Sequence, residues 1–344
     1  MEKTEIKVMN IFICQTPFQL FYAKEIINHF TVANSVENTS LVFHSNLNLI
    51  PNDTANKIEY FNLGNERGVL NRFIRFKKAK NKVDKIIRTP AQNISIFIPH
   101  TSGVLTNYIF NLKNTFDNKK VSLNLFYEGI LYLYDYQEHF QRHHINRFLL
   151  GLLLGFIYRR DKIILPKDSE KVKHIYTPIK KFTTGDRSKT IELPFEQKSP
   201  IEINPNQYLI LGGPVVFLRK FYEDCIRQIA KSSNQDFIIY YKGHSSFETH
   251  YTQYKTMFHE IASKHKVNYV LLSSNEPIES LIEQIKPSVI YSYYSSALLN
   301  ISLMFPNNFK IICYLDELNP HFKMFKSIFN HFNIKTIFVN QSLK

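Results

Sequence analysis

The sequence predicts an α/β protein made of two doubly wound, Rossmann-like domains that face a central cleft. Short apolar runs typical of buried parallel strands alternate with longer amphipathic segments, and this alternation occurs in both halves of the chain. The length of 344 residues is long for one hydrophobic core and sufficient for two. Ligands of such folds bind at the carboxyl ends of the strands, so we expect the functional residues there.

Nine apolar runs are the predicted strands. They are NIFICQ, SLVFH, ISIFIPH and SLNLFY in the first half, and QYLILG, DFIIYYKG, NYVLLSS, SVIYSY and KIICYL in the second. Between the halves, residues 183–207 are rich in proline, charge and small polar residues and lack a sustained period, which predicts a hinge. We therefore place one domain at residues 1–190 and the other at residues 200–344.

The first predicted helix begins directly after the first predicted strand. Thr16 occupies the N-cap position, Pro17 the first helical position, and Gln19 the third position after the cap, which together form a capping box. No glycine lies in this turn, which disfavours the dinucleotide site of a simple Rossmann dehydrogenase. Two interpretations stay open. The turn is either a capped helix and nothing more, or it directs Gln15, Thr16 and Gln19 into the cleft.

The composition favours an anionic partner. The chain has 43 lysines and arginines against 29 aspartates and glutamates, a formal net charge of +14. This suits nucleic acid, a phosphorylated or acidic ligand, or an anionic membrane. Cys14, Cys225 and Cys313 are far apart and predict neither a disulfide framework nor a zinc site, so we expect a reducing compartment. The first nine residues lack the apolar core of a secretory signal, and we expect a cytoplasmic protein.

Two further segments carry positive charge. Residues 147–160, RFLLGLLLGFIYRR, form an apolar run bracketed by arginines, too short to span a bilayer, which takes about 20 residues. The run is interpreted as a buried core helix or homodimer helix. The alternative is docking on the anionic inner face of the membrane, with Arg147, Arg159, Arg160 and the preceding QRHH as its charged part. The lysine-rich residues 72–88 predict a solvated helix face rather than a nucleic-acid arm.

Candidate site residues follow two of the predicted strands. Glu128 comes directly after SLNLFY and precedes Gly129, where a carboxylate can accept a proton from a bound hydroxyl. The alternative for Glu128 is a solvated turn residue. Lys242, Gly243 and His244 follow DFIIYY. They combine a point charge, a glycine that lets a ligand approach the backbone, and a histidine that can donate to a phosphate oxygen.

A third set follows SVIYSY, where Ser295 and Ser296 open a predicted helix. Hydroxyls and free N–H groups at a helix N-terminus bind anions; the alternative, a plain N-cap, explains only one of the two serines. Gly213, within GGP, is another point where ligand can reach backbone. Together these sets predict a metal-free nucleotide-phosphate site in the second domain and a base in the first. No D-x-D, Walker A or H-E-x-x-H pattern occurs.

The order of these motifs resembles that of the bacterial lipooligosaccharide sialyltransferases, glycosyltransferase family 52, which have a GT-B fold. TPFQ is similar to the N-terminal signature of that family. YEG stands where bacterial sialyltransferases carry an acidic pair and glycine, KGHS where they carry His-Pro, and SS where they carry a paired serine. Tyr127 departs from the acidic pair, and Ser245 departs from the proline.

The resemblance implies an inverting sialyltransferase that moves sialic acid from CMP-sialic acid to a sugar hydroxyl. The implied acceptor is a terminal galactose of a bacterial surface glycan such as lipooligosaccharide or capsule. Glu128 is implied as the general base, His244 as general acid or phosphate ligand, and Glu279 as the residue that takes the ribose hydroxyls. The remaining candidate site residues are Lys242, Gly243, Gly213, Ser295 and Ser296 for the CMP phosphate, and Gln15, Thr16 and Gln19 on the acceptor side, with no metal.

Two alternatives to this reaction stay open. Another GT-B glycosyltransferase of surface polysaccharide synthesis would use a UDP-sugar, because one fold serves many donors. A nucleic-acid-binding protein would explain the positive charge. It would not explain a carboxylate, a histidine and a serine pair at successive strand ends, and no nucleic-acid-binding module is recognisable.

Overall fold

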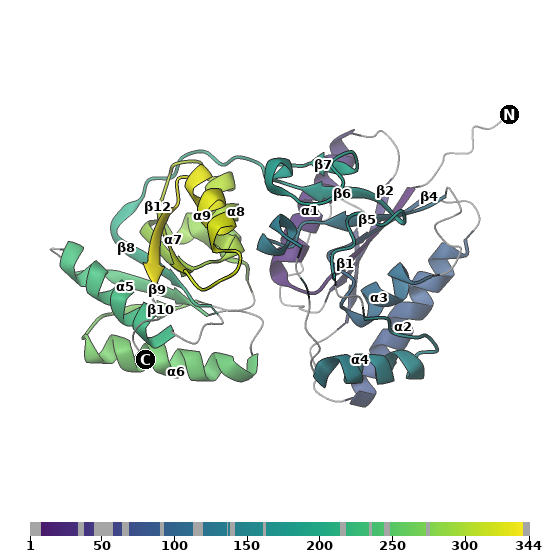
Figure 1. The fold of residues 1–344 in the computed structure, drawn as a ribbon, viewed down its shortest axis with the longest axis horizontal. Helices are drawn as coiled ribbons and strands as arrows, with labels where there is room; N and C mark the ends of the chain where they lie inside the picture. The colour runs from purple at the N-terminus through teal and green to yellow at the C-terminus, as the bar shows by residue number, and fades with distance from the viewer. Residues whose placement is uncertain are drawn as a thin grey trace. The chain divides into compact units, whose positions relative to one another are not determined.

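A computed structural model of the chain divides into two compact units, Met1–Pro194 and Phe195–Lys344. The residues it describes are 8–33, 38–44, 58–63, 69–89, 93–112, 120–135, 137, 142–160, 163–213, 218–233, 236–243, 248–272 and 276–339. Each unit contains one parallel sheet with helices on both faces (Figure 1). The predicted α/β class with two doubly wound domains is confirmed.

The first unit is built on a seven-stranded sheet in the order β3-β2-β1-β4-β5-β6-β7. Its strands are β1 (Val8–Cys14), β2 (Asn38–His44), β3 (Ile58–Asn62), β4 (Asn93–Ile98), β5 (Val121–Phe126), β6 (Val172–Thr177) and β7 (Thr190–Glu192). Its helices are α1 (Pro17–Ala33), α2 (Val69–Ile87), α3 (Val104–Phe110) and α4 (Arg142–Leu153), with short 3-10 turns η1 (Ile130–Leu133) and η2 (Lys180–Phe182). Figure 1 shows α1 on one side of this sheet and α2, α3 and α4 on the other.

The second unit repeats this plan with six strands in the order β10-β9-β8-β11-β12-β13. Its strands are β8 (Asn204–Leu211), β9 (Ile238–Lys242), β10 (Tyr269–Leu271), β11 (Pro287–Tyr293), β12 (Lys310–Asp316) and β13 (Lys335–Val339). Its helices are α5 (Leu218–Ser232), α6 (Glu248–Lys264), α7 (Ile278–Ile285), α8 (Ser296–Met304) and α9 (Phe322–His331). The strand order reverses between β1 and β4 in the first sheet and between β8 and β11 in the second. These are the topological switch points, where open α/β sheets bind ligands.

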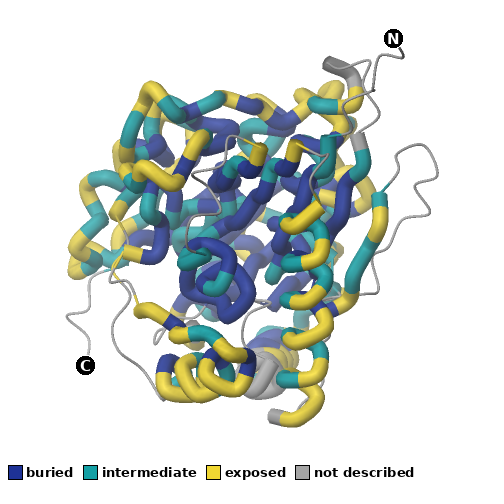
Figure 2. Tube along the Cα trace, turned by 90° about the vertical axis from the view of Figure 1, so that its right-hand side faces the viewer, coloured by how far each residue is buried: buried dark blue, intermediate teal, exposed yellow. Residues whose placement is uncertain are grey.

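The central strands carry the hydrophobic cores. Ile11, Phe12 and Ile13 of β1 are fully buried, and the Phe12 ring stacks on Phe97 of β4 at 4.4 Å between ring centroids. Figure 2 shows the same pattern, with buried residues along the inner strands and exposed residues along the outer sides of the helices. Burial on both faces explains why these strands are continuous apolar runs rather than alternating patterns.

Four strands were not predicted from the sequence: β3, β6, β7 and β13. The sequences of β3 (IEYFN), β6 (VKHIYT) and β13 (KTIFV) include polar or charged residues, so these strands lack a continuous apolar run. β7 has three residues and lies within residues 183–207, which the composition had marked as a hinge. The three cysteines are buried free thiols.

Candidate active site

The start of α1 is held by the reciprocal hydrogen bonds of a capping box. The backbone N–H of Gln19 donates to Thr16 Oγ1 at 3.2 Å. The backbone N–H groups of Gln15 and Thr16 donate to Gln19 Oε1 at 2.6 and 3.3 Å. The predicted capping box, with Pro17 as the first helical residue, is confirmed. The Thr16 hydroxyl therefore caps the N-terminus of α1.

Gln19 also connects this helix to Glu128. Its Nε2 donates to Glu128 Oε2 at 2.9 Å, across 109 positions of sequence. Glu128 lies just beyond β5, and the chain turns at Gly129 with φ 117° and ψ −151°, a conformation that side-chain-bearing residues rarely adopt. The Glu128 side chain is only 5% exposed, so the solvated-turn interpretation of this residue is wrong.

The surroundings of Glu128 favour its neutral form. Burial raises the pKa of this carboxyl to about 8, and the hydrogen bond from Gln19 opposes the shift. Glu128 Oε1 is buried and has no hydrogen-bond partner among the described residues. A carboxyl with a pKa near the working pH can exchange a proton in either direction, which is the property required of a general base.

His100, which was not predicted from the sequence, faces the same carboxyl. Its Nε2 lies 3.5 Å from Glu128 Oε2. Its Nδ1 accepts the backbone N–H of Ser102 at 3.2 Å and lies 2.9 Å from Ser102 Oγ. Because Nδ1 accepts an N–H, the proton of the neutral ring is on Nε2, directed toward Glu128. The sequence feature that could have identified His100 as a site residue is its position at the end of the predicted strand ISIFIPH.

These side chains follow three adjacent strands. Gln19 comes after β1, His100 after β4 and Glu128 after β5, and the switch point lies between the first two strands. The Gln15 side chain lies against the start of α3, where Gly103 leaves room because any Cβ there would collide with the Gln15 amide. The structure therefore brings Gln15, Thr16 and Gln19 to the same sheet edge as Glu128.

The departure at Tyr127 has a structural explanation. This ring is fully buried and makes edge-on contacts with Phe18, Tyr22 and Tyr132. Its backbone N–H still pairs with Tyr176 of β6 at 2.9 Å. The position preceding Glu128 therefore faces the core, where a second carboxylate would be desolvated without a charged partner.

In the second unit, Lys242 is the last residue of β9 and is 8% exposed. Burial lowers its pKa to about 8, while Glu279 and Glu276 oppose the shift. Its carbonyl accepts the backbone N–H of Gly212 at 2.8 Å, so the end of β9 lies beside Gly212 and Gly213 at the end of β8. A lysine at this edge supplies positive charge next to backbone that a ligand can approach.

The serine pair lies at the start of α8. Ser295 is the N-cap, and its Oγ accepts the backbone N–H of Ala297 at 3.3 Å. The cap interpretation accounts for Ser295, and Ser296 is the first helical residue. β11, which leads into this helix, is the neighbour of β8 on the side opposite β9. Lys242, the glycines and the serines therefore follow three adjacent strands around the second switch point.

Glu279 lies in the first turn of α7 and is buried. Asn300 of α8 donates from Nδ2 to Glu279 Oε1 at 2.7 Å, a contact the sequence did not predict. Burial raises the pKa of Glu279, and Asn300 and Lys242 oppose that shift. Asn300 Oδ1 is buried without a hydrogen-bond partner among the described residues. His244 and Ser245 lie outside the part of the chain that the structure describes, whereas Gly243 lies within it.

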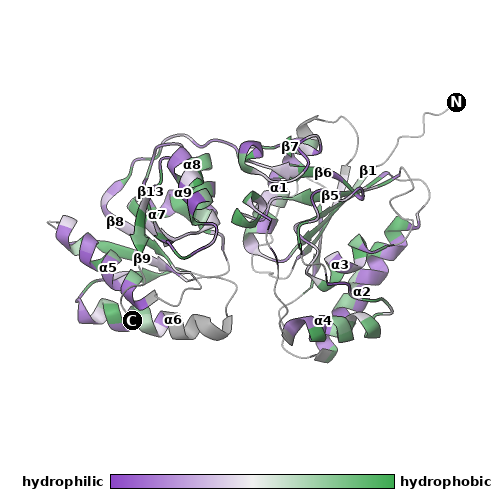
Figure 3. Cartoon of the chain, in the orientation of Figure 1, coloured by the Kyte–Doolittle hydropathy of each residue, from purple (hydrophilic) through white to green (hydrophobic). Residues whose placement is uncertain are grey.

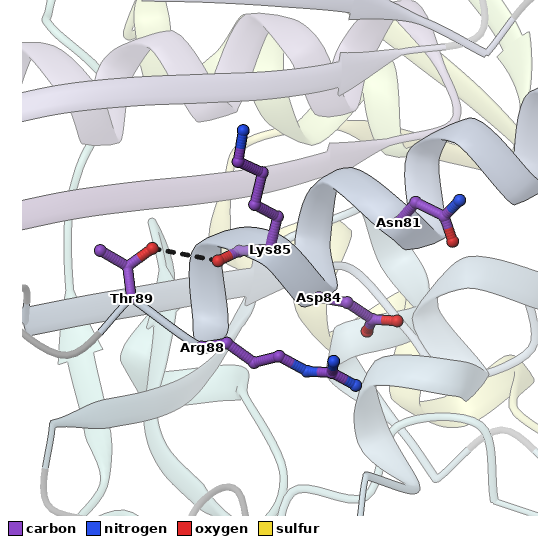
Figure 4. A pocket seen from close by; sticks show the side chains of 5 residues that line it. All are labelled: Asn81, Asp84, Lys85, Arg88 and Thr89. Carbon is purple, nitrogen blue, oxygen red and sulfur yellow. Dashed lines mark hydrogen bonds between the residues drawn. The ribbon is translucent and has the colours of Figure 1, made fainter.

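A metal centre and a surface pocket are two other types of site. No group of three or more histidine, cysteine, aspartate or glutamate side chains able to hold a metal occurs among the described residues. A surface pocket of about 620 Å³ lies at the carboxyl end of α2, lined by Asn81, Asp84, Lys85, Arg88 and Thr89 (Figure 4). Asp84 already pairs with Lys80 at 2.9 Å, and a helix carboxyl end repels anions. This pocket contains none of the candidate residues.

Comparison with known proteins identifies the fold. No protein-family model and no curated protein matches the chain. The GT-B domain of a Photobacterium damselae sialyltransferase has 12% identity and a TM-score of 0.53, covering 96% of this chain and 99% of that one. A Photobacterium damsela sialyltransferase structure has 12% identity and a TM-score of 0.54, covering 97% and 82%.

A UDP-GlcNAc 2-epimerase from Neisseria meningitidis, bound to UDP-GlcNAc, is also similar. It has 10% identity and a TM-score of 0.51, covering 95% of this chain and 91% of that one. The chain therefore has the GT-B fold, made of two Rossmann-like domains. Because transferases and epimerases share this fold, the likeness does not choose the reaction.

Proposed function

We propose that the chain is an inverting sialyltransferase. It would move sialic acid from CMP-sialic acid to a sugar hydroxyl, such as the terminal galactose of lipooligosaccharide or capsule. The observation that carries the proposal is the buried carboxyl of Glu128, close to a switch point. One of its oxygens is bonded to Gln19, and the other has no hydrogen-bond partner among the residues that the structure describes. The likeness to the Photobacterium damselae enzyme over 96% of this chain and the order of the TPFQ, YEG, KGHS and SS motifs support it.

In this mechanism, ionised Glu128 removes the proton of the acceptor hydroxyl. The hydroxyl oxygen forms the new bond to the anomeric carbon of sialic acid. The bond from that carbon to the phosphate oxygen breaks, and CMP leaves with its electron pair. Gln19 and His100 act as positioning residues, because both direct N–H groups at Glu128 Oε2 and leave Oε1 for the acceptor.

The donor would be held by the second unit. Lys242 and the N-terminus of α8, with Ser295 and Ser296, supply positive charge and N–H or O–H donors for one phosphate. His244 would donate to the same phosphate, and Gly213 and Gly243 would let the nucleotide approach backbone. Glu279, oriented by Asn300, would take the ribose hydroxyls. None of these contacts requires a metal.

A UDP-sugar-dependent glycosyltransferase of surface polysaccharide synthesis is the second candidate. The observation that favours it is the likeness to an epimerase bound to UDP-GlcNAc, at a TM-score close to that of the sialyltransferase domain. A lysine and a helix N-terminus suit the phosphates of either nucleotide.

The test is to incubate the protein separately with CMP-sialic acid, UDP-GlcNAc and UDP-galactose, with and without lactose, in parallel series that contain either EDTA or a divalent metal. We expect CMP release and sialyl-lactose formation from the first donor alone. Release of UDP instead would select the second candidate, and release of neither nucleotide would contradict both. Loss of activity in EDTA that added divalent metal restores would contradict the metal-free site.

A further inference from the structure

A set of large apolar side chains on α4 and the following turn faces solvent. We call this set the α4 face. Its members are Ile145, Phe148, Leu149, Leu152, Leu153 and Ile157, and each is between 41% and 63% exposed. The five on the helix recur at the spacing of one helix face, the pattern that normally packs on a core. The core-helix interpretation of residues 147–160 is therefore wrong for these side chains. Figure 3 shows α4 with hydrophobic and hydrophilic segments side by side.

The α4 face belongs to a well-anchored segment. His144 of α4 is buried, as is Leu154 directly after the helix, and α3 packs against α4. After the helix, the backbone of Arg159 exchanges two hydrogen bonds with the Asn107 side chain of α3, at 2.6 and 3.0 Å. The Tyr158 hydroxyl donates to the Ser102 carbonyl at 2.8 Å. These contacts hold α4 and the following turn against α3, with the apolar side chains of the α4 face exposed to solvent.

The charge around the α4 face is positive. Residues 142–160 contain no acidic residue and include Arg147, Arg159 and Arg160. α3 also packs against α2, whose sequence VLNRFIRFKKAKNKVDKII has seven lysines and arginines and one aspartate. Figure 1 shows α2, α3 and α4 on the same side of the first sheet. An apolar helix face within basic surroundings has the composition of an interfacial membrane helix.

We propose that the α4 face docks on an anionic lipid bilayer, with α4 lying in the plane of the surface. No helix in the described part of the chain is long and apolar enough to cross a membrane. α4 itself has 12 residues, so at about 1.5 Å per residue it is shorter than the apolar thickness of a bilayer. Leucine, isoleucine and phenylalanine side chains would enter the acyl boundary, and arginines and lysines would contact lipid phosphates.

A second copy of the chain fits this face less well. Two-fold pairing would bring the same arginine-rich surface of both copies together, and opposed like charges weaken an interface. Lipid phosphates instead neutralise these charges. The proposal goes beyond the glycosyltransferase reaction and does not depend on it, because vesicle binding needs neither donor nor acceptor.

The experiment is sedimentation of the full chain with vesicles of phosphatidylcholine alone or mixed with phosphatidylglycerol, at low and high salt. We expect binding to the anionic vesicles, weakened by salt because screening shortens the reach of exposed charges. Leu149→Ser with Leu153→Ser should reduce partitioning about tenfold or more, since both side chains lose their buried apolar area. The matched control is Val270→Ser with Leu318→Ser, two exposed apolar residues of the second unit, which should bind as wild type.

The charged part is tested in the same assay. Arg159→Gln with Arg160→Gln should weaken binding to anionic vesicles about tenfold, whereas Arg227→Gln with Lys231→Gln on α5, the same change in net charge, should not. Thermal unfolding verifies that every variant is folded. Equal binding to neutral and anionic vesicles, binding to neither, or equal losses in test and control variants would overturn the proposal. Light scattering that shows a dimer lost in the leucine variant, without vesicle binding, would assign the face to a second copy.

Discussion

The carboxyl edges of the two sheets share one topology and carry titratable side chains of opposite type, an acid in the first unit and a base in the second. In each unit a titratable side chain is buried at the end of a strand close to the switch point. Burial raises the pKa of Glu128 from 4.5 to about 8 and lowers the pKa of Lys242 from 10.5 to about 8. One physical cause therefore leaves Glu128 mostly neutral and Lys242 mostly charged near neutral pH.

The difference between the edges lies in their partners. The hydrogen-bond donor to Glu128 is the neutral amide of Gln19, which opposes the rise in pKa that burial causes. Lys242 has the carboxyls of Glu279 and Glu276 nearby, which favour its charged form. The same fold therefore supplies an acid that must lose a proton before it acts and a cation that is ready to bind. The residue type at the strand end, rather than the fold, decides which role each edge takes.

Replacing Glu128 should have the largest effect, because it should slow transfer without changing CMP binding at the other sheet edge. Glu128→Gln removes the proton acceptor, so sialyl transfer should fall by about 10²- to 10⁴-fold while the Kd for CMP, measured by calorimetry, stays unchanged. Glu59→Gln, the same charge change at an exposed position of β3, is the control and should be fully active. Near-wild-type transfer by Glu128→Gln would move the base elsewhere, with Asp135 the next candidate.

Replacing Lys242 should give the opposite pattern. Lys242→Met removes one charged hydrogen-bond donor, so the Kd for CMP should rise about 10- to 100-fold. The control is Lys310→Met, an exposed lysine at the amino end of β12, which should bind CMP as wild type. Unchanged CMP affinity in Lys242→Met would contradict a phosphate site at the second sheet edge.

The pH dependence of stability should also have opposite signs at the two edges. Because the folded pKa of Glu128 is raised, its contribution to stability is complete below about pH 4.5 and is lost as the pH rises through about 8. The folded pKa of Lys242 is lowered, so its contribution is complete above about pH 10.5 and is lost as the pH falls through about 8.

Denaturant unfolding at about pH 5 and about pH 9 measures both contributions. At the higher pH, the free energy of unfolding of Glu128→Gln should exceed that of wild type by on the order of 2 kcal/mol. Each unit of pKa shift is worth about 1.4 kcal/mol, and the full effect is reduced because local motions let water reach the carboxyl. The free energy of unfolding of Lys242→Met should rise relative to that of wild type at the lower pH. A difference between variant and wild type that does not change with pH would show that the pKa of the replaced group is the same in the folded and unfolded states, which would contradict the shift.

The smallest effect concerns the capping box. Thr16→Ala and Gln19→Met both remove a cap and should each destabilise the protein by about 0.5–2 kcal/mol. Only Gln19→Met also removes the hydrogen bond that lowers the pKa of Glu128, so only this variant should shift the pH–rate profile to higher pH. An equal shift in both variants would mean that the cap, rather than the contact with Glu128, sets the profile.

Local patterns predicted much of the fold. The central strands and the capping box of Thr16 and Gln19 depend on neighbouring residues, and the structure has both. The orientation of α4 was not predictable, because periodicity shows that a helix has an apolar face without showing what covers it.

The site was only partly predictable for a related reason. Glu128 and Lys242 were found because each follows an apolar run. The role of His100 depends on the position of β4 between β1 and β5, and strand order is set by contacts between segments that are distant in the sequence. The same holds for Asn300, which reaches Glu279 across 21 positions.

The Gln19 amide joins a backbone N–H to a titrating carboxyl. Gln15 donates to its Oε1, and its Nε2 donates to Glu128 Oε2. Loss of the Glu128 proton strengthens that acceptor and polarises the whole amide, because linked hydrogen bonds reinforce one another. The ¹H–¹⁵N resonance of the Gln15 backbone should therefore move as Glu128 ionises. It is a built-in spectroscopic reporter of the base that requires no substrate and no turnover.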